Sequence, residues 1–573
     1  MAEPHPIAFL SRQPQAGLLA ADNPGVLARV FAARGVRETD ELDRPLSQLL
    51  APNSLVDIDV AAARLVQAVV EQEPILIVGD FDADGATSVT LGVSLLAALG
   101  AGPVDFLVPN RFEFGYGLSE EIVQLAATRN PKVIITVDNG VSSIAGVDAA
   151  NELGIDVIVT DHHLPGADLP RATAVVNPNR RDCAFPSKAI AGVGVIFYVL
   201  GRVRAMLEDR GWFEQRTRPH MADWLDLVAL GTVADVVPLD RNNRILVYQG
   251  LQRIRSGRCR PGIRALCEIA GRDPAKLSAQ DLGYALGPRL NAAGRLDDMS
   301  IGIRCLLAGE LKAAKEFATA LDELNRARRE IENTMVGDAE LMLAGHDLQV
   351  GDRYGVCVFD PSWHQGVVGI VAGRLKDRVH RPVIAFAPAG DMAPDELKGS
   401  ARSIPALHIR DALDAIAARY PGMISKFGGH AMAAGMSIKQ IHYERFAKAF
   451  DAQARSMLPA EALEATVVTD GALQVQEFTL ETARNLTAAG PWGQGFPEPL
   501  FQGEFMVVSQ RVVGERHLKL VVQIDGLLLD AIAFRQAPLA EPGMVELVFH
   551  LAENDYREPA TLQLIVEHLR SLA

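Results

Sequence analysis

Cysteine is scarce in this chain, and no two cysteines form a CxxC pair. The 573 residues contain five cysteines. Such scattered cysteines exclude a disulfide framework and a thiolate metal site, and they suit a reducing compartment. The opening residues, MAEPHPIAFLSRQ, also lack the basic and apolar stretches of a secretory signal. We therefore expect a cytoplasmic protein.

Long hydrophobic runs are scarce as well. No charged residue occurs in the stretch 85–104, which is about the length of a membrane span. This stretch nevertheless contains Thr, Ser, four Gly and Pro103, and it follows a predicted strand. We interpret it as a buried helix, so we expect no association with a membrane.

An excess of positive charge is absent too. Lysine and arginine number 56 against 71 aspartate and glutamate residues, which gives a formal net charge of −15. Bulk attraction to nucleic acid is therefore excluded, and any polyanion site has to be a local basic groove, because salt screens charges beyond about 8–10 Å. The hydrophobic content of 49% is typical of a fully folded chain. The length predicts about three or four domains.

The organisation along the chain predicts two α/β lobes followed by a β-rich region. After an N-terminal appendage (residues 1–50), a first domain (51–320) alternates apolar strands with helical patterns, which predicts a parallel sheet covered on both faces. A long charged helix (321–345) then connects to a second α/β domain (346–457). The last region (458–573) alternates in strand fashion and predicts an OB-like β-barrel or a sandwich. The predicted strands of the first domain are 75–80, 104–109, 132–138, 156–161 and 173–178.

Three aspartates follow the first of these strands at alternate positions, in the stretch ILIVGDFDADGATS. Asp80, Asp82 and Asp84 would face the same way in an extended segment, and they would repel one another unless a cation held them. An aspartate-rich turn that caps the next helix is the alternative interpretation. Ligands of parallel sheets collect at the carboxyl ends of the strands, where Asp80, Asp138 and Asp161 are all expected.

Further carboxylates and two histidines join this set. TVDNG provides Asp138, and VTDHH provides His162 and His163. GTVADVVPL places Asp235 in an apolar run, where an unpaired carboxylate would be costly. A carboxylate-rich set with few imidazoles favours Mn²⁺ or Mg²⁺. So many ligands exceed the needs of one ion, and they indicate two ions sharing a carboxylate and a water, an arrangement suited to displacement at phosphorus.

Basic and glycine-rich motifs elsewhere suggest binding of a phosphate backbone. KFGGHAMAAG places two glycines before His430, so that backbone N–H groups can approach an anion, and a tight turn with a capping histidine is the alternative. Candidate phosphate forks, which could equally be solvated surface residues, are Arg289, Arg295, Arg374 and Arg402. Arg111 lies among aromatic residues suited to unstacked bases or to a core: Phe112, Phe114 and Tyr116.

Taken in order, these motifs resemble the DHH phosphoesterase superfamily. GDFDADGATS, TVDNG, DHH at 161–163 and ADVVPL resemble its four motifs. Further segments are similar to those of its single-stranded-DNA-specific exonucleases: PRLNAAGRL (288–296), WHQGVVGIVAGRL (363–375), KGSARS (398–403), FGGHAMAAG (427–435) and GPWGQGFPEPLF (490–501). Any one motif is weak support, whereas the full ordered set is specific.

The resemblance implies a metal-ligand set of Asp82, Asp84, Asp138, His162 and Asp235. Several relatives carry a histidine four residues before the first aspartate of the DxD pair, where this chain has Val78, and this departure makes Asp80 the implied substitute ligand. His163 would contact the scissile phosphate or the leaving oxygen, or be structural. The implied catalytic residues are His163, Asp82, Asp84 and Asp138. The implied nucleic-acid-binding residues are Arg111, Tyr116, Arg289, Asn291, Arg295, Trp363, His364, Gln365, Arg374, Ser400, Arg402, Gly428, Gly429 and His430.

The activity implied by the resemblance is hydrolysis of single-stranded DNA from its 5′ end to 5′-mononucleotides, with two Mn²⁺ or Mg²⁺ ions, in DNA repair and recombination. A monomer that cooperates with a DNA helicase and a single-strand-binding protein is implied as well. One alternative is a DHH enzyme that cuts short oligoribonucleotides or cyclic dinucleotides, although such enzymes usually lack PRLNAAGRL and a C-terminal barrel of this kind. Another is an inactive DNA-binding replication scaffold, and the intact carboxylate and histidine set speaks against it.

Overall fold

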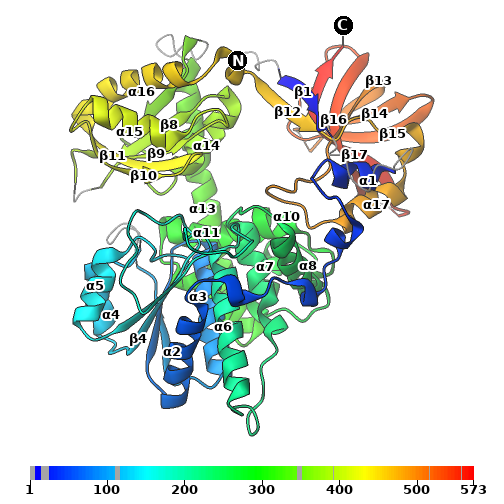
Figure 1. Ribbon diagram of the computed structural model, residues 1–573. Helices are drawn as coiled ribbons and strands as arrows, with labels where there is room; N and C mark the ends of the chain where they lie inside the picture. Colours follow the sequence, from blue (N-terminus) through cyan, green and yellow to red (C-terminus); the bar gives the residue numbers. More distant parts are fainter. Residues whose placement is uncertain are drawn as a thin grey trace. The chain divides into compact units, whose positions relative to one another are not determined.

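The chain divides into two compact units, which are described separately (Figure 1). The larger unit consists of residues 11–324 and 469–573, and the smaller unit of residues 325–468 with the described residues before Ser11. The computed structural model describes residues 7–13, 25–109, 117–344, 352–390, 393–514, 516–555 and 558–572.

A five-stranded parallel sheet forms the centre of the larger unit. Its strands are β2 (Ile75–Val78), β3 (Val104–Leu107), β4 (Val133–Val137), β5 (Asp156–Thr160) and β6 (Ala174–Val176). They lie in the order β3-β2-β4-β5-β6, and each neighbouring pair is parallel. The predicted parallel sheet of the first domain is therefore confirmed.

Helices cover both faces of this sheet, so both faces of its strands are apolar. Ile75 and Ile77 of β2 belong to one hydrophobic core, while Leu76 and Val78 belong to another. The first core contains residues of α2 (Ile58–Glu71), α3 (Ala83–Ala98) and α6 (Gly192–Asp209), and the second contains residues of α4 (Glu120–Ala127) and α5 (Ile144–Glu152). The uncharged stretch after the aspartates forms α3, a largely buried helix, as predicted. No helix in the described part of the chain is long and apolar enough to span a membrane.

A helical region follows the sheet. Its members are α7 (Leu225–Ala234), α8 (Arg241–Arg255), α9 (Pro261–Ile269), α10 (Ala279–Asp281), the π-helical turn η6 (Leu282–Leu286), α11 (Gly287–Leu296) and α12 (Ser300–Leu307). The long helix α13 (Leu311–Ala344) comes next. It begins before the predicted connecting helix (321–345), and it continues from the larger unit into the smaller one.

The C-terminal part of the larger unit is a closed five-stranded barrel. Its strands are β13 (Phe501–Val513), β14 (His517–Ile524), β15 (Leu527–Ala533), β16 (Met544–Asn554) and β17 (Thr561–Ser571), preceded by α17 (Leu480–Ala489). They close in the order β13-β14-β15-β17-β16, with Phe501, Phe505 and Phe549 buried inside. Of the two architectures that the sequence left open here, the barrel is the one observed.

The N-terminal segment contributes to the larger unit through a buried ion pair. After α1 (Val26–Ala32), the guanidinium of Arg34 donates to both carboxylate oxygens of Asp470, at 2.7 and 2.9 Å. The two side chains are only 1% and 2% exposed. Asp470 also accepts hydrogen bonds from Arg12 and from the backbone of Leu500. A carboxylate thus joins three parts of the chain.

The smaller unit is a second α/β fold with its own core. Its sheet has the order β10-β11-β9-β8-β7, in which only β7 and β8 are parallel. Phe386, Phe446 and Phe450 are fully buried in the core. The elements are β7 (Val356–Phe359), α14 (Val368–Val379), β8 (Val383–Pro388), β9 (Glu396–Arg402), α15 (Ile409–Arg419), β10 (Ile424–Gly429), β11 (Ala433–Lys439) and α16 (Tyr443–Met457), and β1 (Ile7–Ser11) pairs with β12 (Ala465–Thr469).

Replacing Asp470 by Ala is expected to lower the free energy of unfolding by about 3–5 kcal/mol, because it leaves the Arg34 guanidinium buried without its carboxylate. Chemical unfolding of the full chain measures this change. Arg171→Ala is the control: its ion pair with Asp148 is formed by a side chain that is 80% exposed, so a change below about 1 kcal/mol is expected. Equal effects of the two substitutions would contradict the structural role of Asp470.

Candidate metal centre

Seven acidic and histidine side chains converge at the carboxyl ends of β2, β4 and β5. Three groups have potential ligand atoms within 4.8 Å of one another: Asp80, Asp82 and Asp138; Asp84, His162 and Asp235; and Asp138, His162 and His163. Together these groups contain all six side chains predicted as metal ligands, and also His163. Parallel strands bring their carboxyl ends to one edge of the sheet, which is why residues so distant in sequence meet there.

The loop that carries Asp82 and Asp84 is held by α11. Asp82 is the N-cap of α3, and its Oδ1 accepts a hydrogen bond from the Gly85 N–H at 2.9 Å. The side chain of Asn291 on α11 accepts a hydrogen bond from the Ala83 N–H at 2.7 Å. The helix approaches this loop closely at Gly294, where a Cβ would lie 1.7 Å from the carbonyl oxygen of Phe81. Asn291 was predicted to contact nucleic acid. In the structure its side chain instead stabilises the loop of the metal site.

Asp84 lies against the N-terminus of α6. Its carboxylate accepts hydrogen bonds from the backbone N–H groups of Gly192, at 2.6 Å, and Val193, at 3.0 Å. A Cβ on Gly192 would lie 2.7 Å from the Cβ of Asp138, and one on Gly231 would lie 2.8 Å from Asp84 Oδ1. Sequence reasoning missed both glycines. The available signal was a glycine inside an apolar helical pattern, which marks close packing.

Burial and mutual repulsion disfavour the charged forms of these carboxylates. Burial and the neighbouring Asp82 charge raise the pKa of Asp84 to about 7. Burial, followed by the charge of Asp84, raises the pKa values of Asp138 and Asp235 well above the usual range. The buried Oδ2 of Asp235 makes no hydrogen bond to the described residues and lies 3.5 Å from His162 Nε2. Cations would offset the repulsion among the carboxylates and would give the unpaired Asp235 oxygen a partner. The residues present therefore fit divalent metal ions.

Asp161, the first residue of the DHH motif, orients the second histidine. Its Oδ1 lies 2.8 Å from His163 Nδ1, and its carboxylate also accepts the backbone N–H groups of His162, His163 and Val141. Although burial opposes its ionisation, the hydrogen bond and charge of His163 lower the pKa of Asp161 to about 2. Burial opposes the charge of His163 too, yet Asp161 raises the pKa of His163 to about 9. Asp161 therefore orients His163 beside the metal ligands.

Asn139 joins the ends of two strands at this centre. Its amide nitrogen donates to the carbonyl oxygens of Val78, at 3.2 Å, and Val137, at 2.8 Å. Asp161 was expected at this edge of the sheet from its position at a strand end, but it was assigned no role, and Asn139 was not predicted at all. Asn139 directly follows a predicted strand, and this position was the signal that could have identified it.

In the smaller unit, several predicted nucleic-acid-binding residues lie on β9 and β10, the strands on either side of β11. Gly435 of β11 pairs with Ser400 of β9 on one side and with Gly428 of β10 on the other. Arg402 donates to Ser400 Oγ at 3.2 Å, and burial lowers its pKa. Gly429 has a φ of 143° and begins the turn that exposes His430. We call the residues of this part of the sheet the GGH surface: Ser400, Arg402, Gly428, Gly429 and His430.

Other predicted nucleic-acid-binding residues are used within the fold. Arg289 is buried and donates to Asp322 at 2.9 Å, which favours a structural role over a phosphate contact. Trp363 is 4% exposed, so packing accounts for it better than base stacking. Arg374 is exposed and paired with Glu332 at 3.0 Å. His364, Gln365 and Arg295 are half-buried, and Arg111 and Tyr116 lie outside the described residues.

Comparisons with known proteins agree with these features. The DHH family N-terminal domain matches residues 74–232, the DHHA1 domain matches 351–456 and the RecJ OB domain matches 469–568. The chain is 53% identical to the single-stranded-DNA-specific exonuclease RecJ of Dickeya dadantii (strain 3937), over 98% of this chain and 99% of that protein. It is 52% identical to the Escherichia coli (strain K12) protein of the same name, over 96% of each. The chain belongs to the RecJ family.

The fold agrees with solved structures of RecJ, two of which contain a divalent metal ion. The crystal structure of RecJ in complex with Mn²⁺ from Thermus thermophilus is 29% identical, with a TM-score of 0.83, and the match covers 100% of this chain and 80% of that one. A Mg²⁺ complex of RecJ from the same source also matches this chain. In this RecJ-family chain the acidic and histidine side chains are positioned to bind the same divalent ions.

Without metal, the protein is expected to lose stability as the pH rises from about 4 to about 7. The folded state keeps a proton on Asp84 up to a pKa of about 7, whereas the unfolded state releases it near pH 4, so the contribution is present at low pH and lost on deprotonation. Thermal unfolding in a chelator measures this. Asp84→Asn should flatten the dependence, and Mn²⁺ should restore wild-type stability at about pH 8. A metal-free wild type that becomes more stable over this range would contradict the assignment.

Proposed function

We propose that this protein is an exonuclease that hydrolyses single-stranded DNA from the 5′ end to 5′-mononucleotides, using two Mn²⁺ or Mg²⁺ ions. The observation that carries the proposal is the convergence of five aspartates and two histidines at one sheet edge in a RecJ-family chain. The curated relatives bear the name single-stranded-DNA-specific exonuclease. A complete ligand set argues against an inactive scaffold.

In this proposal, the metal ligands and the catalytic histidine have separate roles. The metal ligands are Asp80, Asp82, Asp84, Asp138, His162 and Asp235. When bound, the ions supply Lewis acidity that offsets the negative charge on the scissile phosphate. His163 is kept protonated by Asp161, so it can donate a hydrogen bond to a phosphate oxygen or a proton to the leaving oxygen. Asn139 and Asn291 keep the loops of the site in place.

The GGH surface is proposed to bind the phosphate backbone of the strand. Its glycines lack side chains that would keep a phosphate from the backbone, and Arg402 provides a guanidinium that suits two phosphate oxygens. Burial already disfavours the charge of Arg402 within the fold. A phosphate anion would offset that cost, which supports Arg402 as the central contact.

The cellular setting follows from the sequence and is proposed with the activity. The enzyme acts as a cytoplasmic monomer in DNA repair and recombination, on single strands that a helicase opens and a single-strand-binding protein covers. Of the two sequence-based alternatives, cleavage of short oligoribonucleotides would use the same metal ligands. The substrate comparison below separates it from the preferred activity.

End-labelled strands test the direction of cleavage. A label at the 5′ end should appear at once as mononucleotide, while a label at the 3′ end should remain on gradually shortening strands, and Asp82→Ala should abolish both reactions because it removes a metal ligand. Blunt duplex and short oligoribonucleotides of equal concentration serve as comparison substrates. Early release of the 3′ label, or equal cleavage of duplex, would refute a 5′ exonuclease of single strands.

Substitutions in the GGH surface should weaken DNA binding without loss of metal. Arg402→Ala and His430→Ala are expected to raise KM for single-stranded DNA about tenfold, and Arg402→Ala should reduce the salt dependence of binding by about one ion. Arg410→Ala, at an exposed position on α15, is the matched control and should leave KM unchanged. Calorimetric titration with Mn²⁺ completes the test, because loss of metal in His430→Ala would place that histidine in the metal site instead.

A further inference from the structure

Asp235 occupies a turn whose conformation is unusual for its sequence. It is the first residue after α7, and Val236 follows with a φ of 62°. The left-handed region normally suits glycine or asparagine, and a β-branched residue adopts it only where the surroundings hold it. The position of the Asp235 carboxylate therefore depends on what fixes the chain just after it.

A segment from the far end of the sequence fixes that chain. The Leu239 N–H donates to the carbonyl oxygen of Gln494 at 2.7 Å. A Cβ on Gly493 would lie 2.8 Å from Leu239 Cδ1, and one on Gly495 would lie 3.2 Å from Pro238 Cβ. Because Gly493 and Gly495 have no side chains, this segment can lie against Pro238 and Leu239. Larger residues at these two positions would push the two segments apart.

The segment 490–496 is itself firmly anchored in the larger unit. Its Trp492 is 7% exposed and donates its indole N–H to the Leu486 carbonyl oxygen at 2.9 Å. Gly493 and Phe496 exchange two backbone hydrogen bonds, at 2.9 and 3.1 Å. The Arg244 guanidinium lies over the Phe496 ring, 4.2 Å from its centroid. A rigid segment of this kind can impose a position on a loop that it touches.

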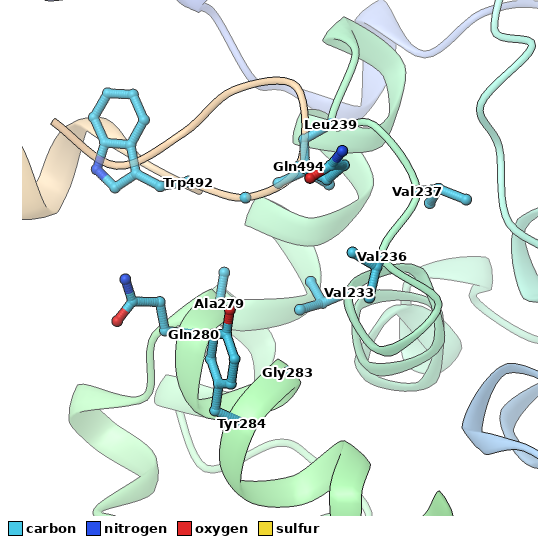
Figure 2. Close-up of a pocket in the computed structure, with 11 residues that line it drawn as sticks. Val233, Val236, Val237, Leu239, Ala279, Gln280, Gly283, Tyr284, Trp492 and Gln494 are labelled. Carbon is cyan, nitrogen blue, oxygen red and sulfur yellow. The ribbon is translucent and has the colours of Figure 1, made fainter. Parts of the chain in front are cut away.

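Beside the contacts at Pro238 and Leu239, a cavity of about 130 Å³ lies between the two segments (Figure 2). Figure 2 shows Val233 and Val236 on one side of this cavity and Gln494 on the other. Packing therefore does not restrain Val236 from the side of the cavity. The turn is held by its own hydrogen bonds, from the Asp235 N–H to the Gly231 carbonyl oxygen and from the Val236 N–H to the Val233 carbonyl oxygen. The contacts of the segment 490–496 with Pro238 and Leu239 add an external restraint.

We propose that the segment 490–496 is a positioning element of the metal centre. Through Leu239 and Pro238 it holds the turn at Val236, and so keeps the Asp235 carboxylate in the place where it ligates metal. The inference rests on the proposed function in one respect, the assignment of Asp235 as a metal ligand. On this proposal, a segment that precedes the barrel strands supports the metal centre without contributing a ligand.

A matched pair of glycine substitutions in the full chain tests this proposal. Gly495 and Gly526 have φ values of 71° and 84°, so alanine strains both backbones, but a Cβ on Gly526 has no neighbour within 4 Å, whereas one on Gly495 presses on Pro238. Gly495→Ala is expected to raise the Kd for Mn²⁺, measured by calorimetry, about tenfold, as for other residues that support a metal ligand. Gly526→Ala should bind Mn²⁺ as the wild type does.

A second pair does not depend on a strained backbone. Gly493→Ala should weaken Mn²⁺ binding through its contact with the Leu239 side chain, and adding Leu239→Ala should restore the affinity because the contact is removed while the backbone N–H remains. Unchanged Mn²⁺ affinity in both Gly495→Ala and Gly493→Ala would overturn the proposal, provided that Asp235→Asn weakens binding. If Asp235→Asn binds Mn²⁺ normally, the ligand assignment itself fails.

Discussion

Repulsion among buried carboxylates is the constraint on which the rest of the larger unit depends. A parallel sheet brings its carboxyl strand ends to one edge, and this chain places an aspartate just after β2, β4 and β5. Backbone N–H groups at the start of α6 stabilise Asp84, and His163 stabilises Asp161. Burial, together with repulsion from the neighbouring carboxylates, nevertheless raises the pKa values of Asp138 and Asp235. The carboxylates thus destabilise the folded protein when no metal is bound, and the same carboxylates allow metal ions to bind.

The sequence predicted those site residues whose positions follow from the order of strands and helices along the chain. Strand ends were readable as apolar runs followed by aspartate, so the carboxylates and His162 could be grouped from the sequence alone. Close approach between distant segments could not be read in this way. Gly192 and Gly231 matter because particular side chains lie within 3 Å of where a Cβ would be. Arg289 looked like a phosphate ligand, because its partner Asp322 lies on a different helix and no local pattern joins them.

The compact units of the structure do not coincide with the domains that the family models match. The DHH N-terminal domain and the RecJ OB domain match separate stretches of sequence. Buried residues of both nevertheless belong to one continuous hydrophobic core. The DHHA1 domain lies between them in sequence, yet it has its own core and forms the smaller unit. Contacts such as the one between Leu239 and Gln494 are therefore internal to a single cooperative body.

The ion pair between Arg34 and Asp470 has a consequence for synthesis on the ribosome. The two residues are 436 positions apart, so at about 5–20 residues per second the arginine waits roughly 20 to 90 seconds for its carboxylate. Until then the nascent chain cannot bury that guanidinium without a large desolvation cost. Arg34 therefore cannot be buried beside its carboxylate until Asp470 has been synthesised, which is after the whole of the segment 325–468 that makes up most of the smaller unit. The smaller unit, with its own hydrophobic core, can thus fold before this buried pair of the metal-bearing unit forms.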